Sequence, residues 1–313
     1  MIRIGFFGTP ELSARVLQDF LDSPDYEVVF VVTGEDKPVG RHQVLTANPV
    51  KTLTIKHNLP ILQPARIRGN TDFLEMVASY EADYFVVVAY GKILPKELLE
   101  LPKKYPINIH GSILPKYRGA SPIQASLIAG DVQTWVTIMV MNEKMDEGNT
   151  IDAKIIEIWE DETTETLFEK FAKISGDFAI KTIQKLDQWA IVPKIQDEAQ
   201  VTYCKKITKE EGLLDFHKNA KELYHLYQGF TPWPGTYTVF KWKKLIVEKC
   251  FFSPLLLGDE PGVRWTVIRQ ENEIWIICGK WLLTLSQVKL EWKKSQNIKE
   301  FLNGQRDFIG SVL

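Results

Sequence analysis

The hydrophobic residues in the first 190 positions follow two alternating patterns. Short, unbroken apolar runs rich in β-branched and aromatic residues are typical of buried strands. These runs lie at residues 2–7, 26–33, 84–91 and 106–110. Apolar residues recur at helical spacing in segments at 10–22, 48–57, 70–80 and 122–129. Apolar strands that alternate with helices indicate an α/β fold with a doubly wound, mostly parallel sheet of the Rossmann-like type.

Residues 134–151 extend this pattern with a predicted strand, a turn containing Asp and Gly, and a return strand. The segment at 163–186 then has apolar residues on one helical face and Thr163 or Thr164 as its cap. This long helix ends the first predicted domain, which spans residues 1–189.

The helical periodicity stops near residue 190. The polar stretch at 190–207 contains Pro193 and predicts a linker. A short helix near 217–227 is followed by strand-like runs at 236–242, 244–252, 264–270, 273–279 and 281–288. Several short strands joined by turns are typical of small barrels. Residues 208–313 are therefore predicted to form a C-terminal β-barrel domain of the oligonucleotide-binding (OB-like) kind.

Length and composition agree with two globular domains. The chain has 313 residues, of which 45% are hydrophobic and 25% are charged, so it can fill a core and we do not expect disorder. No run approaches the roughly 18–20 apolar residues of a membrane helix, and the first residues read as a strand rather than a leader. We therefore expect a cytoplasmic protein, in a bacterial cytosol or an organelle matrix, with no membrane partner.

The charge of the chain is distributed unevenly. Residues 201–313 carry 17 Lys and Arg against 12 Asp and Glu, a net charge of +5, whereas residues 1–200 carry 21 against 28, a net charge of −7. A basic C-terminal third points to a polyanionic partner, although a lysine-rich solvated surface would give the same count.

The three cysteines, Cys204, Cys250 and Cys278, are far apart and form no CxxC pair. We expect buried, reduced thiols rather than a zinc or redox site. The sequence shows no metal-ligand cluster elsewhere, so no metal is predicted.

The strand PINIH at 106–110 places an amide and an imidazole on one face. A period of two directs Ile107 and Ile109 to one side, and Asn108 and His110 to the other. Ligands in doubly wound folds bind beyond the carboxyl ends of the strands. A histidine there is able to move protons near neutral pH, and an asparagine NH₂ can bind an oxygen that gains negative charge. A lone histidine at a strand end is more often structural.

A catalytic histidine usually requires a carboxylate partner. Asp146, in the turn after the strand that should lie beside PINIH, and Asp152 are both candidates, while a solvated turn aspartate is the alternative reading. The sequence has no serine in a nucleophile elbow and no cysteine near PINIH, so no covalent intermediate is expected.

Several blocks together resemble the formyltransferases that use 10-formyltetrahydrofolate. The central block is HGSILPKYRGASPIQASLIAGD (110–131), preceded by NI and followed by VTIMVMNEKMDEGNTI. The resemblance continues through GFFGTPE, VTGEDKPVGRHQVLTANPVK, VAYGKILP, KITKEEGLLDF, GFTPWPGTY and VKLEWKKSQNIKEFLNGQR. The KPVGR loop, the PWPG block and the C-terminal third are similar to the branch that formylates methionyl-tRNA.

This resemblance implies an enzyme, a one-carbon group transferase that acts in translation initiation. The formyl group of 10-formyltetrahydrofolate, the co-substrate, would pass to the α-amino group of methionyl-initiator tRNA by direct amine attack and a tetrahedral intermediate. Asn108, His110 and Asp146 would be the catalytic residues. The expected partners are charged initiator tRNA and the small-molecule folate, and the expected state is a monomer.

The resemblance also implies which residues bind the two substrates. The folate would be held by Ser112, Ile113, Leu114, Pro115, Val88, Ala89, Tyr90, Gly91, Ile93 and Leu94. Lys37 and Arg41 in the loop at 36–51, with Lys205, Lys206 and Lys209 in the basic third, would contact tRNA. That loop otherwise reads as a flexible, solvent-facing connection.

The chain departs from the family pattern at several positions. These are Glu35, His42, Gln43 and Val44 in the loop, and Trp135, Gln228 and Trp292 elsewhere.

Two other functions remain as alternatives to transfer onto tRNA. A sugar-nucleotide N-formyltransferase of the same superfamily is one alternative. A non-catalytic RNA-binding or folate-binding protein is another.

Overall fold

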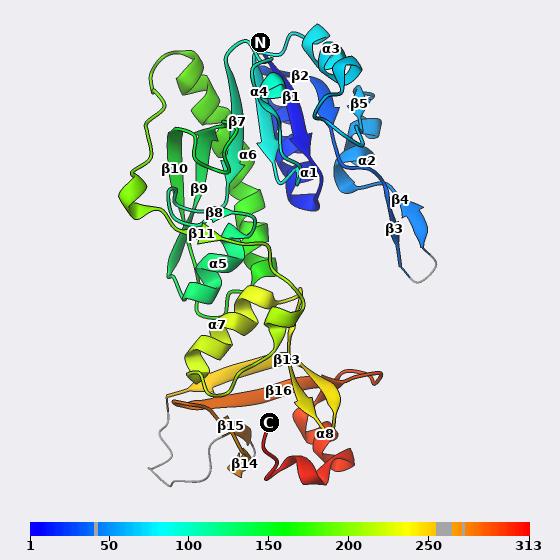
Figure 1. The fold of residues 1–313 in the computed structure, drawn as a ribbon, viewed down its shortest axis with the longest axis vertical. Helices are drawn as coiled ribbons and strands as arrows, with labels where there is room; N and C mark the ends of the chain where they lie inside the picture. Colours follow the sequence, from blue (N-terminus) through cyan, green and yellow to red (C-terminus); the bar gives the residue numbers. More distant parts are fainter. Residues whose placement is uncertain (41–42, 255–264, 271–272) are drawn as a thin grey trace. The chain divides into compact units, whose positions relative to one another are not determined.

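The computed structural model describes residues 1–40, 43–254, 265–270 and 273–313 (Figure 1). Its helices are α1 (Glu11–Asp22), α2 (Pro49–Lys56), α3 (Thr71–Ser79), α4 (Lys96–Leu99), α5 (Pro122–Ala129), α6 (Thr164–Asp187), α7 (Ala220–Phe230) and α8 (Ile298–Gly304). Its strands are β1 (Ile2–Gly8), β2 (Tyr26–Val32), β3 (Lys37–Val39), β4 (Val44–Thr46), β5 (Ile61–Leu62), β6 (Tyr84–Val88), β7 (Tyr105–His110), β8 (Arg118–Gly119), β9 (Gln133–Val140), β10 (Thr150–Glu157), β11 (Tyr203–Cys204), β12 (Thr236–Phe240), β13 (Lys243–Ser253), β14 (Val267–Gln270), β15 (Glu273–Ile277), β16 (Leu282–Leu290) and β17 (Gln296–Asn297).

The chain folds into two compact units. The first comprises Met1–Pro122, Gln133–Glu157 and Phe168–Cys204. The second comprises Ile123–Val132, Ile158–Leu167 and Lys205–Leu313, so it includes most of α5 as well as the C-terminal third.

The first unit is built on a seven-stranded sheet in the order β10-β9-β7-β6-β1-β2-β5. The pairs β5-β2, β2-β1, β1-β6 and β6-β7 are parallel, whereas β9 is antiparallel to both β7 and β10. The strand order reverses direction at β1 and β6, and this reversal is the switch point at which ligands bind in doubly wound folds. The predicted α/β class is confirmed.

Helices cover both faces of this sheet. On one face, Phe7, Phe30 and Phe85 pack with buried residues of α3 and α4 in a single apolar cluster. On the other face, Phe20 of α1 lies edge-on to Tyr26, and the Tyr26 hydroxyl donates to the Ile180 carbonyl of α6. With both faces covered, the central strands β1, β2 and β6 are mostly apolar, as the sequence pattern predicted.

The second unit contains an antiparallel sheet in the order β12-β13-β16-β15-β14, with β17 beside β16. Its core joins residues of this sheet to α7, α8 and Phe308. This is the C-terminal antiparallel β domain that the sequence predicted as an OB-like barrel. In the same unit, α5 and α7 approach closely, because a Cβ at Gly229 would lie 2.4 Å from Ile128.

Asparagine caps explain where four of the helices begin. Asn48, Asn70, Asn219 and Asn297 each accept a hydrogen bond from a backbone N–H of the first helical turn. An N-cap of this kind satisfies one of the N–H groups that a helix start leaves unpaired, a contribution of about 1 kcal/mol.

Several parts of the fold were missed in the sequence, among them β5, α4, β17 and α8. The short strands β3 and β4 form a hairpin in the loop at 36–51, and β10 continues to Glu157, six residues beyond the predicted end. The parallel pair β8–β11 was also missed, and it lies in part within the segment predicted as a linker. Strands of two or three residues are too short to leave a periodic signal.

Five of the nine tryptophans have a left-handed backbone. They are Trp189, Trp242, Trp265, Trp281 and Trp292, with φ between 58° and 69°. Side chains with a Cβ rarely adopt this conformation, which glycine reaches freely. Each of these positions therefore carries backbone strain.

In the residues that the structure describes, no helix is both long enough and apolar enough to cross a membrane.

Candidate active site

Strand β7 carries Asn108 and His110 to the carboxyl edge of the parallel sheet. It lies between β6, where Val87 pairs with Asn108, and β9, where Thr137 pairs with His110. The alternation of the strand directs both polar side chains to one face, and both approach the same carboxylate, that of Asp146.

Asp146 lies in the connection between β9 and β10. Its Oδ1 is 3.4 Å from Asn108 Nδ2, which donates to it, and 3.7 Å from His110 Nδ1. Its Oδ2 accepts from the backbone N–H of Gly119 at 2.8 Å. The second candidate, Asp152, lies on β10 and faces Lys185 of α6, at 3.9 Å, so of the two aspartates it is Asp146 that contacts the histidine.

The tautomer of His110 follows from its neighbours. Nε2 lies 3.1 Å from the Tyr117 carbonyl oxygen, which can only accept, so Nε2 carries the proton and Nδ1 presents a lone pair toward Asp146. Burial lowers the pKa of His110, and the nearby Asp146 carboxylate offsets only part of this effect. The ring is therefore neutral near pH 7, and two proton acceptors face each other in the site.

The turn that holds Asp146 is tightly constrained. Asp146 has φ of 54°, in the left-handed region. A Cβ at Gly148 would lie 1.8 Å from the Val140 carbonyl oxygen, so this close approach admits only glycine. Gln196 holds the turn from the other side, donating through Nε2 to the carbonyls of Asp146 and Gly148 at 2.7 Å each.

The loop after β7 contains the predicted folate residues Ser112 to Pro115. Ser112 is fully buried and its hydroxyl donates to the Lys116 carbonyl at 2.6 Å. Leu114 is also buried, whereas Ile113 and Pro115 are partly exposed. The fold itself therefore accounts for the side chains of Ser112 and Leu114, and the surface of the loop comes from the other two residues.

The predicted folate residues after β6 divide in the same way. The side chains of Val88, Tyr90 and Leu94 are buried, and Tyr90 packs on Phe7. Ala89, Gly91 and Ile93 are exposed, and Ile93 keeps 75% of its surface accessible. Thr9, after β1, donates to the Tyr90 carbonyl and so ties together the two strand ends at the switch point.

The predicted tRNA contacts are surface residues where the structure describes them. Lys37 begins the β3–β4 hairpin and is exposed, while Arg41 lies outside the described residues. Lys205, Lys206 and Lys209 are exposed in the second unit, and Lys205 pairs with Glu211 at 3.2 Å.

Sequence reasoning missed the residues that support the site from residues 190–204. Gln196 is one of them, and Thr202 is another, since its hydroxyl accepts from the Tyr117 N–H at 2.8 Å. Arg118 follows the strand PINIH in a loop, where a cation usually lies at the surface, yet it is completely buried. The only signal for this support was the polarity of a stretch that reads as a linker.

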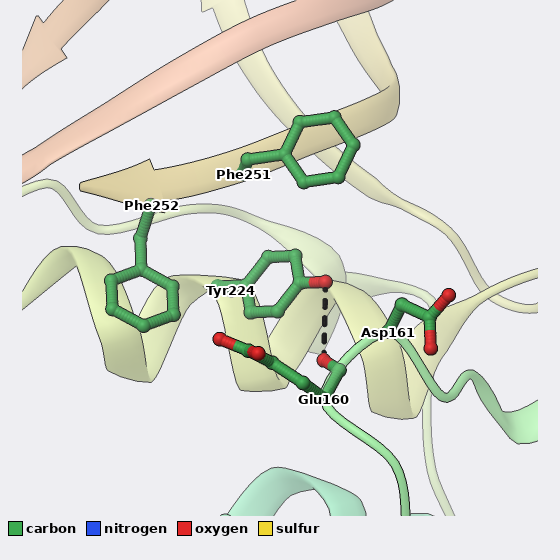
Figure 2. Close-up of a pocket in the computed structure, with 5 residues that line it drawn as sticks. All are labelled: Glu160, Asp161, Tyr224, Phe251 and Phe252. Carbon is green, nitrogen blue, oxygen red and sulfur yellow. Dashed lines mark hydrogen bonds between the residues drawn. The ribbon is translucent and has the colours of Figure 1, made fainter.

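A separate hollow of about 350 Å³ lies in the second unit (Figure 2). Glu160, Asp161, Tyr224, Phe251 and Phe252 line it, and the Tyr224 hydroxyl donates to the Glu160 carbonyl. None of the predicted site residues contributes to it.

The loop between β10 and α6, which contributes Glu160 and Asp161 to this hollow, explains one of the departures from the family pattern. Gln228 is buried, and its Nε2 donates to the Glu160 and Glu162 carbonyls at 2.8 and 2.7 Å. Gln228 therefore holds a loop of its own unit and offers no surface to RNA.

The other departures lie mostly at the surface. Glu35 is 3.9 Å from Lys92, Gln43 and Val44 are exposed in the hairpin, and His42 lies outside the described residues. Trp135 is half-buried on β9, and Trp292 is 90% exposed in a turn. No group of three or more potential metal ligands occurs within the described part of the chain.

Comparison with known proteins gives the family. The model described as "Formyl transferase" matches residues 2–183, and that described as "Formyl transferase, C-terminal domain" matches 206–306. The methionyl-tRNA formyltransferase of Sulfurimonas denitrificans is 40% identical over 313 residues, all of both chains. The chain belongs to the formyl transferase family, in its methionyl-tRNA branch. The predicted enzyme class, a one-carbon group transferase, is confirmed.

Two solved structures show the same fold. An N-formyltransferase from Helicobacter canadensis, in complex with folinic acid and dTDP-3-aminofucose, matches with a TM-score of 0.66 at 17% identity, over 91% of this chain and 99% of that one. A methionyl-tRNA formyltransferase from Clostridium thermocellum matches with a TM-score of 0.57 at 16% identity, over 93% and 99%. At these identities the likeness concerns the fold alone.

Proposed function

We propose that this chain transfers the formyl group of 10-formyltetrahydrofolate to the α-amino group of methionyl-initiator tRNA. The observation that carries the proposal is the convergence of Asn108 and His110 on one oxygen of Asp146. Identity over the whole length to methionyl-tRNA formyltransferases supports the choice of substrate. The reaction would belong to translation initiation in a cytosol or organelle matrix, and the chain would act as a monomer.

His110 and Asp146 would remove the proton from the attacking amine. An amine must lose a proton as it bonds to the formyl carbon, and Nδ1 and Oδ1 are two acceptors 3.7 Å apart. Burial keeps His110 neutral and thus able to accept, and the Asp146 carboxylate stabilises the imidazolium that results. The same nitrogen can then deliver the proton to the departing nitrogen.

Asn108 would stabilise the negative charge that develops on the formyl oxygen. Its amide has two N–H donors, and the bond to Asp146 employs one of them. The other is free to bind the oxygen during attack, which is the role of a preorganised donor in acyl transfer. The half-buried position of Asn108 keeps this donor accessible to substrate.

The folate would lie along the loops that follow β6 and β7. The pterin end of the formyl donor is a ring system with apolar faces and polar edges, so the exposed Ile93 and the partly exposed Ile113 fit its faces. Backbone groups around Ala89 and Gly91, both exposed, supply polar partners. Val88, Tyr90, Ser112 and Leu114 would shape the backbone from below, since their side chains are buried.

Charged residues outside the site would hold the tRNA. The net charge of +5 over residues 201–313, with exposed Lys205, Lys206 and Lys209, suits a phosphate backbone. Lys37 and Arg41 would contact the acceptor end. Under this proposal residues 1–189 form the catalytic domain, 190–207 the connecting segment and 208–313 the tRNA-binding domain, with residues up to Cys204 held within the first unit.

A transfer assay tests the proposal. The protein is incubated with labelled 10-formyltetrahydrofolate and with methionyl-initiator tRNA, uncharged tRNA or an amino-sugar nucleotide. Label should appear on the charged tRNA alone. Transfer to the sugar nucleotide alone would indicate the alternative N-formyltransferase, and folate or RNA binding without transfer would indicate a binding protein.

A further inference from the structure

We propose that Gln196, oriented by the buried Arg118, is a positioning residue that fixes the turn carrying Asp146. The inference rests on the proposed function, because it assigns Gln196 a role in formyl transfer through Asp146. It concerns a side chain in the stretch that the sequence predicts as a linker, more than thirty residues beyond the sheet strands of the site.

The amide of Gln196 uses all of its hydrogen-bonding capacity. Nε2 donates to the Asp146 and Gly148 carbonyls, and Oε1 accepts from Arg118 Nε and Nη2 at 3.0 and 2.9 Å. The orientation of the amide is unambiguous, since reversing it would place NH₂ against guanidinium donors and oxygen against two carbonyls. Gln196 is 6% exposed, so loss of these bonds would leave buried groups unpaired.

Arg118 fixes Gln196 in turn. The side chain of Arg118 is fully buried, and its Nη2 donates to Glu198 Oε1 at 2.8 Å. A buried guanidinium requires such partners, and its planar fork leaves little freedom of rotation once they are bound. The chain of contacts therefore runs from Glu198 through Arg118 and Gln196 to the backbone of Asp146.

The backbone of Asp146 needs this support. Its left-handed φ of 54° is a conformation that persists only where surrounding contacts impose it. Its carboxylate must also stay within reach of Asn108 and His110, at 3.4 and 3.7 Å. Displacement of a catalytic group by about 1 Å can cost roughly 10²-fold in rate. Two bonds from Gln196 to the turn hold both the conformation and the distance.

Two variants test the assignment. Gln196→Glu keeps an acceptor for Arg118 but removes both N–H donors, and Gln196→Met removes both while nearly keeping the volume. We expect kcat to fall by ~10-fold to 10²-fold in each, with a smaller change in KM for the formyl donor. Gln200→Glu is the matched control, because Gln200 is exposed and its amide bonds only to Asp197 in the described structure.

A double-mutant cycle separates positioning from a general structural role. If Gln196 acts through Asp146, then adding Gln196→Glu to Asp146→Asn should lower kcat by less than about 2-fold further. Additive losses, or wild-type kcat in folded Gln196→Glu and Gln196→Met, would overturn the proposal. Failure of both variants to fold would overturn it as well, since Gln196 would then serve the fold.

A readout without substrate keeps this test independent of the proposed function. The Asp146 carboxylate raises the pKa of His110 against the effect of burial, so NMR titration of His110 should give a lower pKa in Gln196→Met than in wild type. An unchanged titration would overturn the positioning role even if the protein formylates nothing. A wild-type protein inactive on every amine would overturn only the proposed function.

Discussion

His110 donates from Nε2 to the Tyr117 carbonyl and thereby turns the lone pair of Nδ1 toward Asp146. The backbone of the loop after β7 thus decides which nitrogen of the ring presents its lone pair to the Asp146 carboxylate. Substitutions at and around this pair should have distinct effects on activity and stability, which experiments can measure.

The two aspartates after β9 provide a matched pair of variants. Asp146→Asn should lower formyl transfer by ~10²-fold or more, because the amide cannot stabilise a protonated His110. Asp152→Asn makes the same chemical change at a residue that faces Lys185, and its transfer rate should stay close to wild type. Single-turnover kinetics with both variants measure the effect. Equal losses in the two would remove Asp146 from the mechanism.

The stability of the fold should depend on pH through His110. Burial lowers the pKa of this ring below its ordinary value, so at intermediate pH the unfolded chain binds a proton that the folded chain does not. The free energy of unfolding therefore rises with pH across that window and declines as the pH falls below the ordinary histidine pKa.

Denaturant unfolding between about pH 5 and pH 7 measures this slope. Burial also lowers the pKa of His225, which contributes to the slope in the same direction. The slope of the wild type is therefore compared with that of His110→Gln, in which only the contribution of His110 is removed. The variant should show a shallower dependence on pH. An identical slope in the two proteins would mean that His110 binds its proton equally in the folded and the unfolded chain.

Glycine should make the turn after β16 more stable than tryptophan does. Trp292 has φ of 66°, and 90% of its surface is exposed, so its ring adds little burial to offset the strain. Trp292→Gly should raise the free energy of unfolding by about 1 kcal/mol. Trp292→Ala removes the ring but keeps the Cβ, and it should not give this gain. Equal stability of the two variants would place the effect in the ring.

The lysines at the start of the second unit should control affinity for tRNA. Replacing Lys205, Lys206 and Lys209 with Gln should weaken tRNA binding and reduce its salt dependence by roughly 0.7 to 0.9 in log–log slope per lost phosphate contact. Folate affinity should not change. Lys181→Gln, an exposed lysine of α6 paired with Asp177, is the control. Salt slopes that match wild type would show that the RNA is held elsewhere.

The sequence predicted the first sheet well because its signals are local. Runs such as 84–88 are apolar on both faces, and the alternation in PINIH predicts that Asn108 and His110 lie on the same face. Strand pattern alone left open the choice between Asp146 and Asp152, since it depends on how the β9–β10 turn folds back, and only the family resemblance singled out Asp146. Gln196 and Arg118 were beyond prediction as partners, because their contact joins residues 78 apart and leaves no periodic trace.

The β8–β11 pair changes where the first unit ends. Thr202 accepts from Tyr117, and Cys204 pairs with Gly119, so the last residues before the second unit are held within the first. A fragment cut at residue 189 would lose these bonds together with Gln196, while one cut after Cys204 would retain them. The boundary that matters for an autonomous catalytic fragment is therefore set by hydrogen bonds across 80 residues of chain, and not by the polar composition that marks a linker.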